Sequence, residues 1–182
     1  MKKIITILIV ILMLSLPHKA FAAELENTTS AKLLATTTNY AQDNRTKMLK
    51  AYLEQYNSPL ADHAQTFVED ADKYNLDWKL VAAISGVEST FGEAIPADSY
   101  NGWGWGVYGD NVIRFTSWDN AIDTISQGLR ERYLGTSPDS DPYMIGPTYA
   151  ASPTWAVRVA SFMDLIQQFD TLHAKDQLSI SL

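Results

Sequence analysis

The chain contains no cysteine among its 182 residues. That absence excludes disulfide bonds, cysteine-linked lipid anchors and thiolate metal sites, so an exported form must be held together by its core alone. Histidine is also scarce, because the chain has only three, and no two of them stand at a spacing typical of metal ligands. We therefore expect no metal ion.

Signatures of two further kinds of site are missing. The chain has no G-x-S-x-G, so a serine nucleophile is unsupported. The glycines over residues 102–106 alternate with tryptophan, unlike a glycine-rich loop that cradles phosphate. We therefore expect no cofactor. Positive charge is scarce too, since 14 Lys and Arg stand against 21 Asp and Glu. Such a chain is a poor candidate for nucleic acid or an anionic membrane surface, but a neutral glycan stays possible.

No apolar run is long enough to cross a membrane by itself. The run Ile4–Leu16 is shorter than the roughly 20 residues that span a bilayer. It follows Lys2-Lys3 and precedes Ala20-Phe21-Ala22, which fits a small-x-small cleavage site. We interpret residues 1–22 as a signal peptide, with an uncleaved anchor as the alternative. The mature protein is then expected in the periplasm, the cell wall or outside the cell, with no stable membrane insertion.

The rest of the chain reads as one domain with two short flanks. Residues 23–44 are polar and threonine-rich, which is typical of a tether. We place a catalytic domain at residues 45–175 and a tail at residues 176–182. Loss of the signal would remove three lysines and take the formal charge from −7 to −10.

Apolar residues at steps of three and four predict a mainly helical domain. The expected helix starts are Arg45, Ser58-Pro59, Asp77, Thr116-Ser117 and Ser152-Pro153. Between the third and fourth of these the period changes, because tryptophan alternates with glycine and Gly109-Asp110 signals a turn before the β-prone residues 112–115. This pattern predicts one small β-hairpin.

Glu88 is the first candidate for chemistry. It is the only acid between Asp77 and Glu93, in a stretch that otherwise predicts a buried helix. A carboxyl group among apolar side chains holds its proton near neutral pH. A general acid needs that property to protonate a leaving glycosidic oxygen. The alternative is a glutamate that reaches solvent from the helix end.

Aromatic and amide side chains follow this helix. Trp103 and Trp105 would share one face of a strand, where flat indole rings suit the C–H faces of sugars, or they fill the core. We expect one of each kind. Asn101 has an amide that suits an N-acetyl group or a hydroxyl, although an asparagine before glycine also forms turns. Tyr149, near Pro147, is either a hydrogen-bond donor to substrate or a packing residue.

A second catalytic carboxylate is not singled out by spacing. The candidates are Glu93, Asp98 and Asp110, and each is expected to be a solvated loop acid.

The motifs together resemble the lysozyme-like superfamily of peptidoglycan-cleaving enzymes. Glu88-Ser89-Thr90-Phe91 is similar to the Glu-Ser-x-aromatic motif of its glucosaminidases and lytic transglycosylases. The glucosaminidase type continues with motifs that resemble residues 101–105, residues 115–122 and Tyr149-Ala150. The resemblance covers about residues 58–170. The Gly-Leu-Met-Gln run of many lytic transglycosylases is absent, which favours the bacterial endo-β-N-acetylglucosaminidase type.

The resemblance implies a mainly α, lysozyme-like domain that cleaves a β-1,4 bond of peptidoglycan strands. It implies Glu88 as general acid and then base, with Asn101, Trp103, Trp105 and Tyr149 along the glycan. Three alternatives stay open: a lytic transglycosylase that leaves 1,6-anhydro products, a non-catalytic glycan-binding module of the same fold, and a structural envelope protein.

Overall fold

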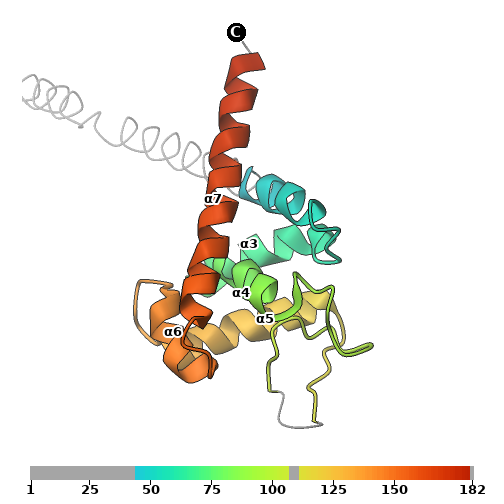
Figure 1. Ribbon diagram of the computed structural model, residues 1–182, viewed down its shortest axis with the longest axis vertical. Coiled ribbons are helices and arrows are strands. Elements are labelled where there is room, and N and C mark those ends of the chain that lie inside the picture. The colour runs from blue at the N-terminus through green and yellow to red at the C-terminus, as the bar shows by residue number, and fades with distance from the viewer. Residues whose placement is uncertain (1–43, 107–110, 181–182) are drawn as a thin grey trace, which may run out of the picture. The chain divides into compact units, whose positions relative to one another are not determined.

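The computed structural model describes residues 44–106 and 111–180, which are mainly helical (Figure 1). This confirms the mainly α fold class predicted from the periodicity. The predicted signal peptide, residues 23–43 of the tether and the Gly109-Asp110 turn lie outside the described residues. Among the residues that are described, no helix is both long enough and apolar enough to cross a membrane.

Seven elements follow the helix over residues 44–54, with which the described part of the chain begins. They are η1 (Ala61–His63), α3 (Ala64–Lys73), α4 (Leu80–Ser89), α5 (Trp118–Leu129), the π-helical turn η2 (Arg130–Leu134), α6 (Pro142–Tyr149) and α7 (Trp155–Ile180). The long helix α7 packs on α4 and α6, whereas α3 packs on α5 (Figure 1). Helix α4 also contacts α5, so it lies between the two groups. Helix α7 continues into the residues predicted as a tail.

At two predicted helix starts the expected capping residue instead closes a short turn, and the helix begins later than expected. Ser58 Oγ accepts a hydrogen bond from the backbone N–H of Leu60 at 3.0 Å, and η1 begins one residue after that. Asp77 Oδ1 accepts from the N–H of Lys79 at 2.9 Å, directly before α4. In both cases the cap holds a short turn that leads into the helix.

The other capped helices give one confirmation and one omission. Ser117 is the N-cap of α5, as predicted, and accepts from the N–H of Asn120 at 3.1 Å. Helix α6 was not predicted, because Gly146-Pro147 resembles a break. Its start nevertheless has a clear local signal, since Asp141 accepts from the N–H of Tyr143 at 2.8 Å and proline holds the first helical position.

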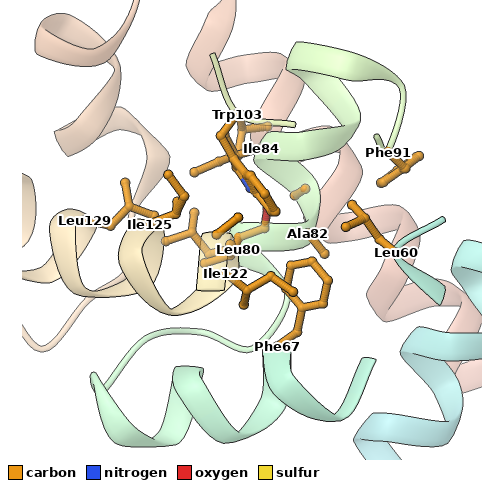
Figure 2. Close-up of a cluster of buried hydrophobic side chains, with 14 of the residues drawn as sticks. Leu60, Phe67, Leu80, Ala82, Ile84, Phe91, Trp103, Ile122, Ile125 and Leu129 are labelled. Carbon is orange, nitrogen blue, oxygen red and sulfur yellow. The ribbon is translucent and has the colours of Figure 1, made fainter. Parts of the chain in front are cut away.

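The core surrounds α4, whose residues from Leu80 to Gly86 are all buried. Trp103 is completely buried, and its indole N–H donates to the carbonyl of Val81 on α4 at 2.9 Å. Figure 2 shows this ring among apolar side chains from several helices. The labelled neighbours are Leu60, Phe67, Leu80, Ala82, Ile84, Phe91, Ile122, Ile125 and Leu129.

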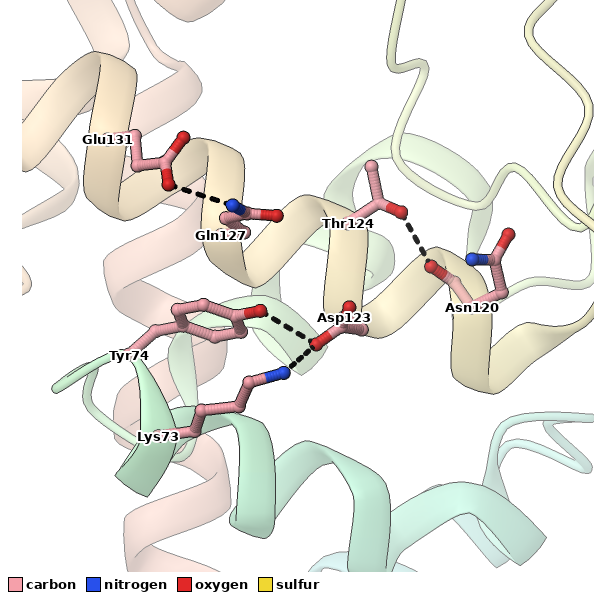
Figure 3. A network of polar contacts seen from close by, with 7 residues as sticks. All are labelled: Lys73, Tyr74, Asn120, Asp123, Thr124, Gln127 and Glu131. Atoms are coloured by element: carbon pink, nitrogen blue, oxygen red, sulfur yellow. Dashed lines mark hydrogen bonds and ion pairs between the residues drawn. The ribbon is translucent and has the colours of Figure 1, made fainter.

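A polar network joins α3 to α5 (Figure 3). Asp123 of α5 accepts from Lys73 Nζ at 2.5 Å and from the Tyr74 hydroxyl at 2.8 Å. Asp70 is only 7% exposed, and one of its carboxyl oxygens has no partner among the described residues. Burial, with the negative charge of Asp123 as the next cause, raises the pKa of Asp70 to about 6. The folded protein therefore favours the neutral form of this carboxyl group.

The expected β-hairpin is not seen in the described residues. Residues 102–106 form two consecutive turns, with Gly104 and Gly106 both at a φ of 61°. The Asn101 amide takes the place of a partner strand, because it donates to the carbonyls of Trp105 at 2.9 Å and Ile113 at 3.0 Å. On the far side of the gap, the described residues before α5 contain one isolated bridge residue, Asn111, and no strand.

Candidate active site

The end of α4 has an unusual backbone. Glu88 is the last residue but one of the helix, and the next residues outside it, Thr90 and Phe91, have φ values of 53° and 56°. Gly92 follows at 87°. A residue other than glycine in the left-handed region typically costs about 1–3 kcal/mol and persists only where its surroundings fix it. The turn after Glu88 is therefore held in place by tertiary contacts.

Ser89 supplies two of those contacts. Its hydroxyl accepts from the N–H of Gly92 at 2.9 Å and donates to the carbonyl of Gly102 at 2.8 Å. The side chain is buried at 3% exposure. A buried hydroxyl with both bonds made joins the end of α4 to the segment over residues 102–106. This joint fixes Glu88 relative to that segment.

The carboxylate of Glu88 is exposed, which corrects the expectation of a group sunk among apolar side chains. The apolar stretch before it predicted a buried helix correctly, but the helix surfaces at Glu88. One oxygen, Oε1, accepts from the indole N–H of Trp155 at 2.6 Å. Trp155 is 2% exposed and opens α7, where the ring of Tyr149 stacks on it at a centroid distance of 4.8 Å. A buried, stacked donor thus fixes one carboxylate oxygen.

The other oxygen, Oε2, faces Gly104. A Cβ atom built on Gly104 would lie 3.5 Å from Oε2 and would meet nothing else within 4 Å. Glycine also suits this position because its φ is 61°. Among the described residues, apart from the chain neighbours of Gly104, only Oε2 lies close to the position that a side chain at Gly104 would occupy.

A cleft of about 370 Å³ opens beside Gly104. Its lining residues are Gly104, Trp105, Gly106, Ile113, Arg132, Tyr133, Thr148 and Tyr149. Gly104 lines this cleft and also lies beside Oε2, so Glu88, which is not itself a lining residue, is separated from the cleft by Gly104. Aromatic rings form much of the wall, which is the kind of surface that binds sugar rings.

The two tryptophans of the segment are divided between core and cleft. Trp103 is completely buried and its N–H is used, so the expected glycan contact of Trp103 does not fit this geometry. Trp105 is 8% exposed and lines the cleft. Its ring packs where Gly128 of α5 leaves space, since a Cβ there would lie 2.5 Å from it. The sequence left open which ring takes which place.

Asn101 holds the segment instead of facing a ligand. It is 3% exposed, its Nδ2 makes the two bonds described above, and its Oδ1 accepts from the N–H of Trp105 at 3.0 Å. Both amide donors are thus used inside the protein. The sugar-binding role expected of Asn101 is corrected for this reason.

Tyr149 closes one wall of the cleft. Its hydroxyl donates to the carbonyl of Trp103 at 2.7 Å, so the expected donation to substrate is replaced by an internal bond. Desolvation, and then the charges of Glu88 and Tyr133, raise its pKa well above the usual range. The group is a neutral phenol at physiological pH, and it is the ring of Tyr149 that lines the cleft.

Among the site residues that were not predicted, Trp155 and Arg132 carry the chemistry. Trp155 was expected in the apolar stripe of the last helix, and the signal for its role was that a buried indole N–H needs an acceptor. Arg132 lines the cleft from η2, and nothing in the local sequence distinguishes it.

Within residues 44–106 and 111–180, no three His, Asp or Glu side chains gather closely enough to hold a metal ion. The chain matches no protein-family model, and no curated protein matches it.

Proposed function

We propose that this chain is an exported peptidoglycan glycosidase of the lysozyme-like, glucosaminidase type, with Glu88 as its general acid. One observation carries the proposal: the Glu88 carboxylate lies beside Gly104, which lines an aromatic-walled cleft, with one oxygen fixed by Trp155 and the other making no hydrogen bond within the described residues. The motifs over residues 58–170 support it. The proposed substrate is the glycan strand, and the proposed location is the periplasm, the cell wall or the exterior.

The hydrogen bond from Trp155 assigns the proton of Glu88 to one oxygen. Because Oε1 already accepts an N–H, the proton of the neutral acid belongs on Oε2, the oxygen beside the cleft-lining Gly104. A glycan bound in the cleft would exclude water from the neighbourhood of this carboxyl group. The acid then has its proton on the side where the glycosidic oxygen lies.

The reaction follows from that arrangement. The proton on Oε2 passes to the glycosidic oxygen as the bond from this oxygen to the anomeric carbon breaks. The Glu88 carboxylate then takes a proton from the incoming nucleophile as its oxygen bonds to the anomeric carbon, and the acid is restored. Water as nucleophile gives hydrolysis, and the 6-hydroxyl of the same sugar gives an anhydro product.

The test is digestion of purified peptidoglycan by the mature chain, with the products read by mass spectrometry. Reducing N-acetylglucosamine ends support the glucosaminidase type, whereas anhydro ends indicate the transglycosylase alternative. Strands that bind the protein but stay intact over long incubation would instead indicate a glycan-binding module. Strands that neither bind nor break would overturn the proposal.

A further inference from the structure

Arg132 differs from the other arginines of the chain. The chain has five, and the other four all donate hydrogen bonds to the protein. These bonds join Arg45 to Asp72, Arg114 to the carbonyl of Ala97, Arg130 to several carbonyls and Arg158 to the carbonyl of Val87. Arg132 makes no hydrogen bond or ion pair within the part of the chain that the structure describes, and its side chain is exposed.

The guanidinium of Arg132 has a defined position. It lies over the ring of Trp105, 5.6 Å from the centroid, and lines the cleft with Tyr133 and Thr148. A planar guanidinium stacks on an indole ring and keeps its in-plane N–H donors free. The ring therefore holds the cation at the cleft without using its hydrogen bonds.

Arg130 fixes the backbone that carries this cation. On the same π-helical turn, its Nε donates to the carbonyl of Tyr74 at 2.8 Å and its Nη1 to that of Ser137 at 2.6 Å. Two arginines two positions apart are thus used in opposite ways. The N–H groups of Arg130 form hydrogen bonds within the protein, whereas Arg132 lines the cleft and its N–H groups are available to a ligand.

The chemistry of that cation suggests its ligand. Free guanidinium donors in a fork match a carboxylate or a phosphate. In a chain with a formal charge of −7, a cation that faces a cleft with no acidic partner among the described lining residues favours an anionic group there. Peptidoglycan differs from neutral chitin in carrying carboxylates, on its lactyl ethers or on the peptides attached to them.

We propose that Arg132 binds a carboxylate of the glycan strand in the cleft that Gly104 and Trp105 line. The inference rests on the proposed function and deepens it, because it makes the acidic substituent of the strand a specificity determinant. The enzyme should then prefer acidic strands to neutral chitin oligosaccharides of equal length. Added salt should reduce this preference, since Arg132 is exposed.

The test measures binding in a background that cannot cleave. Glu88→Gln protein is titrated with a muramic-acid-containing oligosaccharide and with a chitin oligosaccharide of the same length. The acidic ligand should bind about tenfold more tightly at low salt, as expected for one charge-assisted contact. When Arg132→Gln is added to this background, the dissociation constants of the two oligosaccharides should become nearly equal. The matched control is Lys50→Gln, which removes one positive charge from a lysine that does not line the cleft.

Each outcome separates the two proposals. If Arg132→Gln leaves the ratio unchanged, or if the control lowers it equally, the inference is overturned while the glycosidase assignment stands on its own digestion assay. If the wild type cleaves no strand but Arg132→Gln still abolishes the preference, the function fails and the anion site stays. Inorganic phosphate and acetate are also added as competitors at the same concentration. If phosphate competes much more strongly than acetate, the site binds phosphate and the carboxylate proposal is overturned.

Discussion

The segment over residues 101–106 has a core side and a cleft side, and the two are built differently. On the core side, Asn101 and Trp103 are buried and their side-chain donors are bonded to backbone carbonyls. On the cleft side, Gly104 and Trp105 border a carboxylate and a guanidinium that keep free hydrogen-bonding capacity. Neighbouring residues of one short segment therefore serve the fold or present chemistry, according to which side they face.

Two carboxyl groups make the same comparison. Asp70 of α3 is buried and has a raised pKa, which are the properties that the sequence led us to expect of Glu88. Glu88 is exposed, and one of its carboxylate oxygens is held by the hydrogen bond from Trp155. We expect a buried carboxyl group such as Asp70 to affect the stability of the fold. We expect an exposed carboxyl group with a fixed orientation, such as Glu88, to interact with a ligand. Changes on the core side should lower stability, and changes on the cleft side should lower activity.

The largest expected effect is on the cleft side. Glu88→Gln should lower the rate of peptidoglycan cleavage by about 10²–10⁴-fold, as is typical for loss of a general acid. Its melting temperature and glycan affinity should stay near those of the wild type, because the side chain is exposed. The matched control is Glu93→Gln, the same change at an exposed acid beyond the turn. A variant that retains more than a tenth of the wild-type rate would show that Glu88 is not the acid.

The two tryptophans test the division directly through stability. Trp103→Ala should cost about 3–5 kcal/mol of unfolding free energy, because it empties the centre of the core. Trp105→Ala should cost less, about 1–3 kcal/mol, and its folded fraction should bind glycan weakly. Urea unfolding and glycan titration measure both quantities. Normal binding by folded Trp105→Ala protein, or equal losses of stability, would remove the distinction between the two rings.

Trp155→Phe tests whether the buried donor positions Glu88. The ring stays to stack on Tyr149, but the N–H to Oε1 is lost. We expect kcat to fall about 10- to 100-fold while KM changes little, since the loss of one hydrogen bond to a charged group is typically about 1.5–3 kcal/mol. Trp78→Phe is the matched control on a ring outside the cleft. A rise in KM with unchanged kcat would contradict a positioning role.

Local chemistry explains what the sequence predicted. The N-cap at Ser117 and the start signal at Asp77 follow from short-range hydrogen bonds, and the apolar periodicity follows from the core that α4 and α7 share. The described residues do not confirm the hairpin, because the alternation of tryptophan and glycine there reflects left-handed turns closed by the Asn101 amide. Periodicity does not reveal a side chain that replaces a strand partner.

The candidate site was predicted only in part, because its parts meet through tertiary packing. Glu88 and Trp105 stand out in the sequence. Their partners, Trp155 and Arg132, come from helices 67 and 27 positions further along the chain, as their contacts with these two residues show. No local pattern links residues so far apart.

The smallest expected effect is on the core side, where Asp70 should make stability depend on pH. Its pKa is raised to about 6 in the folded protein, so the neutral form adds stability that is complete below the ordinary value of 3.8 and is lost as the pH rises through 6. Asp70→Asn keeps a neutral group at every pH. The unfolding free energy of this variant minus that of the wild type should therefore be larger at pH 7 than at pH 4, by about 1 kcal/mol after allowance for solvent screening.

Asp119→Asn is the control of opposite sign. Hydrogen bonds from Thr66 and His63 lower the pKa of Asp119, so the stability that Asp119 contributes is lost as the pH falls. Thermal melts of the three proteins between pH 4 and 7 measure the difference. An Asp70→Asn protein whose advantage over the wild type is the same at both pH values would show that this carboxyl group does not titrate in the core.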